Sequence, residues 1–142
     1  FNVFGPRQDP LSTYAAVIPK FITLMLDDNP PRVDGDGQQT RDFTYVANVV
    51  AGNLLACHAE NVAGETINVA CGESINLLNM IEILNRIMSK DIKPVFGPPR
   101  TGDVRHSQAS IDKARELLGY EPVATFEEGL AKTVAWYEES LG

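Results

Sequence analysis

Apolar residues recur every three or four positions along three stretches of the chain, and this spacing predicts helices. The stretches are residues 17–27, 46–58 and 77–88. Asn76 is suited to cap the third helix, and the capping-box pattern from Thr125 to Glu128 predicts the start of a last one. Ser110 and Gly119 are suited to begin and end a further short helix.

Shorter runs of β-branched, aromatic and aliphatic residues predict strands. The runs are residues 1–4, 32–34, 43–45, 66–70 and 92–96. Pro94 has no backbone N–H, so the last run predicts an edge strand. Because short strands alternate with helices and no linker or repeat divides the chain, the sequence predicts a single α/β domain. No turn precedes the first run, and we interpret it as the end of a buried strand in a longer protein.

The composition restricts the possible binding partners more than it restricts the possible folds. The chain has 142 residues, of which 44% are hydrophobic and 22% charged, as expected for a folded domain with a core. Its net charge of -7 argues against nucleic-acid and membrane partners, because phosphate groups are held mainly by clustered Lys and Arg. No apolar run reaches the roughly 18 residues that cross a bilayer, and we expect a cytoplasmic protein. Cys57 and Cys71 lie in apolar segments and are expected to be buried and reduced.

Two polar loops contain arginines that could bind an anion. The first loop leads through Gly35 and Gly37 to Arg41, and the second contains Arg100 and Asp103. A guanidinium group suits a diphosphate because its planar fork makes two parallel charge-assisted hydrogen bonds. The alternative is that each arginine pairs with a neighbouring carboxylate, Asp42 or Asp103, and the residues alone support both interpretations equally.

Other chemistry has little support in the sequence. Gly35-Asp36-Gly37 resembles the start of a dinucleotide fingerprint, but Thr40 replaces the third glycine and no strand-to-helix unit surrounds it. His58 and His106 are isolated, and the cysteines lack metal-ligand spacing. We therefore assign no catalytic, cofactor-binding or metal-binding residue to this chain.

Six segments of the sequence follow one another in the order found in one protein family. They are Phe1 to Gln8, Val17 to Phe21, Gly35 to Val46, Ile67 to Val69, Arg100 to Asp103 and Leu118 to Pro122. The chain resembles the C-terminal part of an extended short-chain dehydrogenase/reductase of the NAD-dependent sugar-nucleotide epimerase/dehydratase family. Within it, the chain is most similar to UDP-glucose and UDP-N-acetylglucosamine 4-epimerases.

The resemblance implies that residues 1–142 form one substrate-binding lobe over a Rossmann core, with residues 1–4 the end of a core strand. The implied substrate-binding residues are Asn2 at the diphosphate or sugar, Val17, Lys20, Val33, Asp34 and Gly35 around the uracil, Arg41 and Arg100 at the phosphates, and Asp103 at the ribose hydroxyls. Gln8 and Asn68 are weaker candidates nearby.

The chain departs from the family at the catalytic pair, a Tyr followed four residues later by a Lys. Four tyrosines occur, and the residues at that spacing are Ile18, Val49, Ala124 and Leu141. The resemblance thus implies an intact NAD-dependent 4-epimerase, a homodimer, that binds NAD mainly through an N-terminal part outside this chain, which alone is expected to be inactive. A dehydratase or decarboxylase of the same family stays open, as does a non-catalytic nucleotide-sugar binding module.

Overall fold

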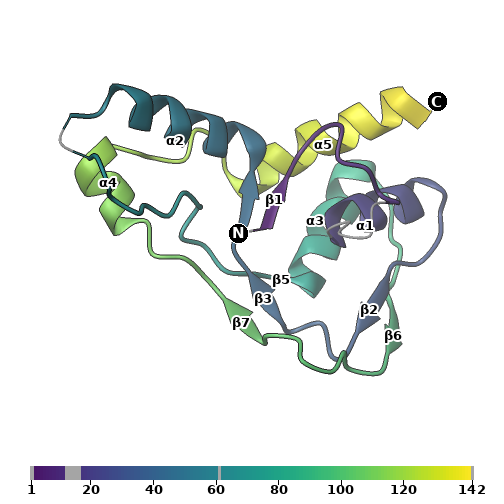
Figure 1. The fold of residues 1–142 in the computed structure, drawn as a ribbon. Coiled ribbons are helices and arrows are strands. Elements are labelled where there is room, and N and C mark those ends of the chain that lie inside the picture. Colours follow the sequence, from purple (N-terminus) through teal and green to yellow (C-terminus); the bar gives the residue numbers. More distant parts are fainter. Residues whose placement is uncertain (1, 12–16, 61, 142) are drawn as a thin grey trace.

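The structure is a computed structural model that describes residues 2–11, 17–60 and 62–141. These residues form five helices and seven short strands, which confirms the predicted α/β class. In chain order the elements are β1 (Asn2–Phe4), α1 (Val17–Leu26), β2 (Arg32–Asp34), β3 (Thr40–Arg41), β4 (Phe43–Tyr45), α2 (Val46–His58), β5 (Ile75–Asn76), α3 (Leu77–Met88), β6 (Val95–Gly97), β7 (His106–Ser107), α4 (Asp112–Leu118) and α5 (Phe126–Leu141) (Figure 1).

The strands are divided among three small sheets. β1 pairs in parallel with β4, and β2 pairs in parallel with β6. β3 lies between β5, which is antiparallel to it, and β7, which is parallel. Only Asp42 separates β3 from β4, so this one residue joins two sheets.

The main hydrophobic core lies where α1, α3 and α5 pack beside β1 and β4 (Figure 1). Phe4 and Phe126 meet edge to face in it, with ring centroids 5.5 Å apart. A second, smaller cluster packs under α4 and includes Ile111, Leu118 and Tyr120. The chain therefore has a compact body and an extension formed by α2 and α4 (Figure 1).

Local sequence signals mark three of the helix ends. The side chain of Asn76 accepts the Asn79 N–H at 2.8 Å and caps α3 as predicted. The Thr125 hydroxyl accepts the Glu128 N–H at 3.2 Å, and the Glu128 carboxylate accepts the Thr125 N–H at 2.8 Å, which confirms the capping box of α5. Gly119 ends α4 with a φ of 61°.

Three sequence predictions about these elements need correction or completion. Ile111, not Ser110, is the N-cap residue of α4, although the Ser110 hydroxyl accepts the Asp112 N–H at 3.3 Å. The strand predicted at 92–96 is instead β6, because the ladder begins only after Pro94, which has no N–H to donate. Tyr14, whose spacing matches the apolar stripe of α1, lies outside the described residues.

The strand predicted over 66–70 is wrong: no ladder includes these residues within the described chain. Val69 instead packs against α2. A Cβ atom on Gly52 would lie only 2.7 Å from a Val69 methyl carbon, so the helix and this segment are in close contact. Packing of its side chains holds this segment in place. An apolar composition suits such packing as well as it suits a strand.

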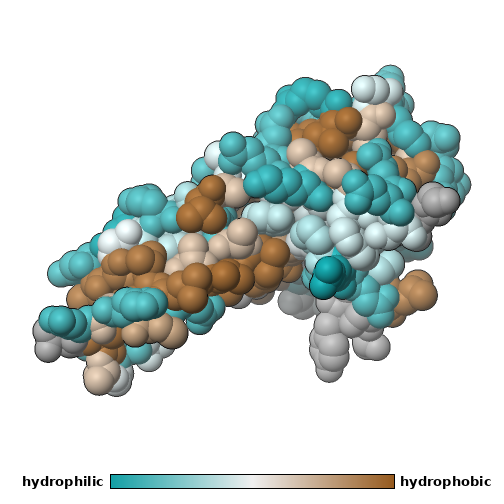
Figure 2. Space-filling view, turned by 90° about the horizontal axis from the view of Figure 1, so that it is seen from above, coloured by the Kyte–Doolittle hydropathy of each residue, from teal (hydrophilic) through white to brown (hydrophobic). Residues whose placement is uncertain are grey.

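α2 forms where predicted, but its most apolar face is exposed. Val50 and Leu54 are 52% and 58% exposed, while the buried residues of the helix are Asn48 and Gly52. Figure 2 shows a band of hydrophobic residues along the part of the molecule that contains α2. Cys57 lies exposed on this helix and Cys71 is half-buried, so the prediction of two buried cysteines is wrong.

Candidate binding site

Two neighbouring pockets open beside the paired strands β2 and β6. The first has a volume of about 480 Å³ and is lined by Asp34, Gly35, Asp36, Gln39, Gly97, Pro99, Arg100, Asp103 and Arg105. The second has a volume of about 390 Å³ and is lined by Val17, Lys20, Phe21, Leu24, Arg32, Asp34 and Arg100. Because Asp34 and Arg100 line both, the pockets form one continuous candidate site.

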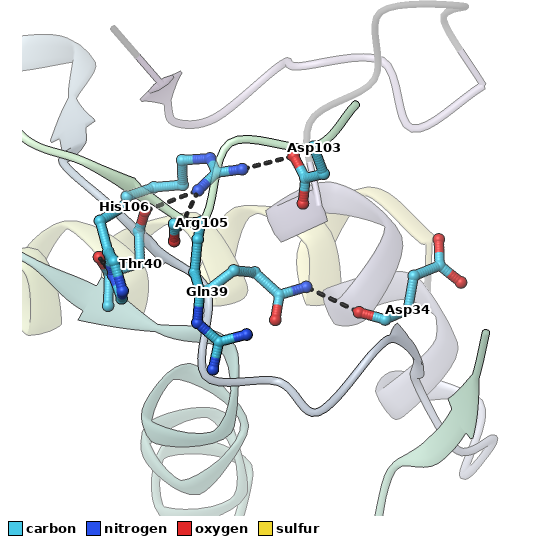
Figure 3. A network of polar contacts seen from close by, with 7 residues as sticks. Asp34, Gln39, Thr40, Asp103, Arg105 and His106 are labelled. Carbon is cyan, nitrogen blue, oxygen red and sulfur yellow. Dashed lines mark hydrogen bonds and ion pairs between the residues drawn. The ribbon is translucent and has the colours of Figure 1, made fainter. Parts of the chain in front are cut away.

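A glycine turn between β2 and β3 makes one wall of the first pocket. Gly35 and Gly37 have φ values of 81° and 75°, which favour glycine, and a Cβ atom on Gly37 would lie 2.7 Å from the Leu78 side chain. The Gln39 amide donates to the Asp34 carbonyl at 2.8 Å and closes the turn (Figure 3). The turn therefore holds its backbone in a fixed position at the pocket.

The loop from β6 to β7 makes the opposite wall and is tied to the glycine turn. Arg105 pairs with Asp36 at 2.8 Å, and the Thr40 N–H donates to the Arg105 carbonyl at 2.8 Å. The Gln38 N–H and the Arg105 guanidinium lower the pKa of Asp36. Thr40 and His106 add a hydrogen bond of 3.0 Å between the Thr40 hydroxyl and Nδ1 of His106 (Figure 3). These contacts fix the distance between the two loops.

Arg41 lies on β3, behind the wall formed by Asp103. Its Nη1 donates to the Thr40 carbonyl at 2.7 Å and to the Arg105 carbonyl at 3.4 Å, and its Nη2 lies 2.5 Å from the Asp103 carboxylate. Arg41 therefore pairs with Asp103 and not with Asp42, its sequence neighbour.

Arg100 forms no ion pair with any residue that the structure describes, which leaves its guanidinium available to a ligand.

Asp42 is a buried residue of the site region that the sequence did not reveal. Its carboxylate is fully buried and accepts the N–H groups of Cys71, Gly72 and Ala109 at 3.0, 2.9 and 3.4 Å. It thereby ties the junction of β3 and β4 to two distant segments. A lone Asp before an aromatic strand carries no signal of this role, because its partners are backbone groups.

The pockets bring together most of the residues that the resemblance implied. Six of the nine line them, namely Val17, Lys20, Asp34, Gly35, Arg100 and Asp103. Arg41 reaches them through Asp103. The side chain of Val33 is fully buried in the main core, and Asn2, on β1, lines neither pocket.

The two weaker candidates lie elsewhere, and some lining residues were not predicted. The Gln8 amide donates to the Val3 carbonyl and the Asn68 amide to the Ser110 carbonyl, both at 3.4 Å. Arg32 and Asp36 line the pockets without having been singled out. In the sequence, only their position next to the glycine turn indicated that these two residues could lie at a binding site.

The described residues offer little for a metal ion or a dinucleotide. Among them, no three His, Cys, Asp or Glu side chains lie close enough together to hold a metal ion. The turn from Gly35 to Gly37 joins two strands and does not lead into a helix N-terminus, so it lacks the setting of a dinucleotide fingerprint. No helix in the described part of the chain is both long and apolar enough to span a bilayer.

Comparisons with known proteins agree with this fold. The model of the NAD dependent epimerase/dehydratase family matches residues 1–70. A putative UDP-glucose 4-epimerase of Methanocaldococcus jannaschii is 35% identical over 98% of this chain and 44% of its own length. A UDP-N-acetyl-alpha-D-glucosaminuronate decarboxylase of Bacillus cytotoxicus is 30% identical over 98% of this chain and 44% of its own length. The crystal structure of UDP-glucose 4-epimerase from Thermotoga maritima with UDP-glucose matches with a TM-score of 0.92 and 40% identity, over 99% of this chain and 45% of that one.

The fold and these matches thus define part of an α/β protein of the short-chain dehydrogenase/reductase type. The family model and these relatives match the chain to the NAD-dependent epimerase/dehydratase family. It spans less than half the length of the curated relatives that it matches.

Proposed function

We propose that this chain is the UDP-sugar-binding part of an NAD-dependent nucleotide-sugar 4-epimerase. The observation that supports this most is that Arg100 and Asp103 line one pocket, with Arg41 paired to Asp103 behind it, in a chain similar to proteins named UDP-sugar 4-epimerases. In this proposal residues 1–142 are a single lobe, the C-terminal part of the intact protein. NAD is held mainly by the remainder, and when bound it would accept and return the hydride at sugar C4.

The charges lining the two pockets favour an anionic ligand. The chain as a whole has a net charge of -7, yet the pockets are lined by four cations, Lys20, Arg32, Arg100 and Arg105, against three carboxylates. We place the diphosphate at Arg100, with Arg41 as a second cation behind Asp103. The second pocket, with the apolar side chains of Val17, Phe21 and Leu24, is suited to the flat base.

Two of the described tyrosines have structural roles that fit a substrate-binding part better than proton transfer. The hydroxyl of Tyr120 donates to the Ala70 carbonyl at 2.9 Å, and that of Tyr137 donates to the Gln8 carbonyl. Burial raises the pKa of Tyr120 to about 12 and also raises the pKa of Tyr137. A catalytic tyrosine needs a lowered pKa, so both of these fit structural roles.

Two features indicate where the remainder of an intact enzyme would dock. β1 and β4 form a parallel pair, and parallel sheets are usually covered on both faces. The adjoining helix α2 exposes Val46, Val50 and Leu54 on one side. Together with the greater length of the relatives, these surfaces support a second lobe packed against β1 and α2.

The binding assignment is tested in the intact protein by titration with UDP. We expect Arg41→Ala and Arg100→Ala each to weaken binding by about 1.5 to 3 kcal/mol, because each removes charge-assisted hydrogen bonds to phosphate. Lys93→Ala is a matched control, because Lys93 pairs with Asp91 on the surface and lines neither pocket. An affinity for UDP that is unchanged in both arginine variants would reject the site.

The reaction is tested by assaying the intact protein with a series of UDP-sugars and NAD. Interconversion of sugars that differ only at C4 is the expected result. The decarboxylase from Bacillus cytotoxicus supports a second candidate, and release of CO₂ from a UDP-uronic acid would favour it. A 4,6-keto product would instead indicate a dehydratase, and binding of UDP-sugars without turnover would indicate a non-catalytic module.

Location and assembly are part of the same proposal. We place the intact protein in the cytoplasm, where nucleotide sugars are substrates, as a homodimer with its contacts outside this chain. Light scattering of the purified intact protein should give twice its chain mass, and a monomer mass would contradict the dimer.

A further inference from the structure

The N–H edge of Arg41 that a phosphate would use is already occupied by a carboxylate. The backbone carbonyls of Thr40 and Arg105 hold its Nη1, and the carboxylate of Asp103 lies 2.5 Å from its Nη2. The side chain of Arg41 is only 16% exposed, whereas that of Asp103 is 37% exposed. Arg41 is thus fixed by its backbone contacts, and Asp103 is the partner that a ligand can displace.

A displaced Asp103 carboxylate needs new hydrogen-bond donors. Of the other cations in the first pocket, Arg105 is engaged by Asp36 at 2.8 Å, and Arg100 is the residue to which we assign the diphosphate. The two hydroxyl groups of a ribose are suitable donors, and they are covalently linked to the diphosphate of a nucleotide. Free pyrophosphate carries the same anionic groups but brings no ribose, so it would leave Asp103 beside a newly bound anion and without a partner.

We propose that Asp103 is a specificity-determining residue, which occupies Arg41 and thereby makes the site select nucleoside diphosphates over free pyrophosphate. This inference rests on the proposed function, because it requires that an anion binds at Arg41. The contact acts as a built-in competitor: every anion must break it, and only a ligand with ribose hydroxyls compensates the loss.

The size of the effect follows from the exposure of the pair. An exposed ion pair changes an equilibrium constant by up to about fivefold, and a pair whose arginine is sheltered is at the upper end of that range or somewhat above it. Removing the competitor should therefore tighten pyrophosphate binding by about three- to tenfold.

The test compares the affinities of UDP and inorganic pyrophosphate by calorimetry of the intact protein. Asp103→Asn keeps the size of the side chain and removes its charge. We expect pyrophosphate to bind about three- to tenfold more tightly to this variant and UDP to change by less than about twofold, because the freed Arg41 is offset by the weaker ribose contact. The preference for UDP over pyrophosphate then falls by about three- to tenfold.

Asp36→Asn is the matched control, because it removes an equal charge from the same pocket and leaves the pair of Arg41 and Asp103 intact. An equal gain in pyrophosphate affinity in this control would overturn the inference, since any lost negative charge would then suffice. Unchanged pyrophosphate affinity in Asp103→Asn, or an equal gain for UDP and pyrophosphate, would overturn it as well.

Arg41→Gln separates this inference from the proposed function. If it leaves UDP affinity unchanged, Arg41 is not part of the anion site, and both the assignment and the inference fail. If it weakens UDP binding while Asp103→Asn leaves pyrophosphate affinity unchanged, the proposed site stands and only the role of Asp103 is rejected. Circular dichroism of each variant confirms that the fold is retained.

Discussion

Replacing Asp42 by Ala should be among the most destabilising single changes in this chain. The carboxylate is fully buried and accepts three backbone N–H groups, from Cys71, Gly72 and Ala109. Alanine would leave these donors facing a cavity without an acceptor. Because Asp42 joins β3 to β4, the loss affects two sheets and both segments that contact them.

The magnitude follows from the hydrogen bonds. A bond to a charged acceptor contributes about 1.5 to 3 kcal/mol, and the bonds of 3.0 and 2.9 Å are well formed, whereas the third, at 3.4 Å, is weak. Folding also desolvates the carboxylate, which offsets part of this gain. We expect Asp42→Ala to lower the free energy of unfolding by about 3 to 5 kcal/mol. Asp42→Asn should cost about 2 to 3 kcal/mol, since its amide keeps one acceptor oxygen.

Urea unfolding of the intact protein, followed by circular dichroism, measures this loss. Asp91→Ala is the control, because Asp91 is an exposed aspartate whose ion pair with Lys93 should contribute less than about 1 kcal/mol. A loss below about 1 kcal/mol for Asp42→Ala would refute the reasoning, because it would mean that water or other groups replace the carboxylate at no cost.

Three further changes test packing, burial and capping. Gly129→Ala should lower the free energy of unfolding by about 1 to 3 kcal/mol in thermal unfolding, since the new Cβ would lie 2.6 Å from the buried Tyr45 ring. Helix propensity alone implies the opposite, and a gain in stability of about 1 kcal/mol would contradict the packing argument. Tyr120→Phe should lower the free energy of unfolding by about 1 to 2 kcal/mol at pH 8. This difference from the unsubstituted protein should shrink between about pH 10 and 12, because Tyr120 ionises first in the unfolded protein while burial raises its pKa in the folded protein to about 12. A difference that stays constant with pH would exclude this linkage. Thr125→Ala should lower the free energy of unfolding by about 0.5 to 2 kcal/mol through loss of the reciprocal bonds with Glu128, and no change in urea unfolding would show that the cap is dispensable.

The helices could be predicted because the interactions that define them are local. The cap of α3 joins Asn76 to Asn79, and that of α5 joins Thr125 to Glu128, so each is visible within four residues of sequence. The strands depend on partners far along the chain. The run at 66–70 has the composition of a strand, but its place is set by the contact of Val69 with Gly52, which no local pattern reveals.

The candidate site likewise has a part that could be predicted from the sequence and a part that could not. Its two loops could be recognised from glycines and arginines, and the structure brings them together around one pocket. The pairing of Arg41 with Asp103, 62 residues later, could not be predicted, because Asp42 is the nearer carboxylate in sequence. Chain geometry explains the outcome: Asp42 follows β3 directly and turns into the interior, where backbone donors take both of its oxygens.

The sequence pattern and the described surface disagree most at the exposed face of α2. Val46, Val50 and Leu54 recur at helical spacing, which predicts burial, yet all three are exposed. The side of α2 that does pack against the chain uses Asn48, which bonds the Ala124 backbone, and Gly52, which approaches Val69. A helix apolar on the opposite side is suited to lie between two layers. Its pattern therefore supports the second lobe that we propose, and the relatives that the chain matches are more than twice as long.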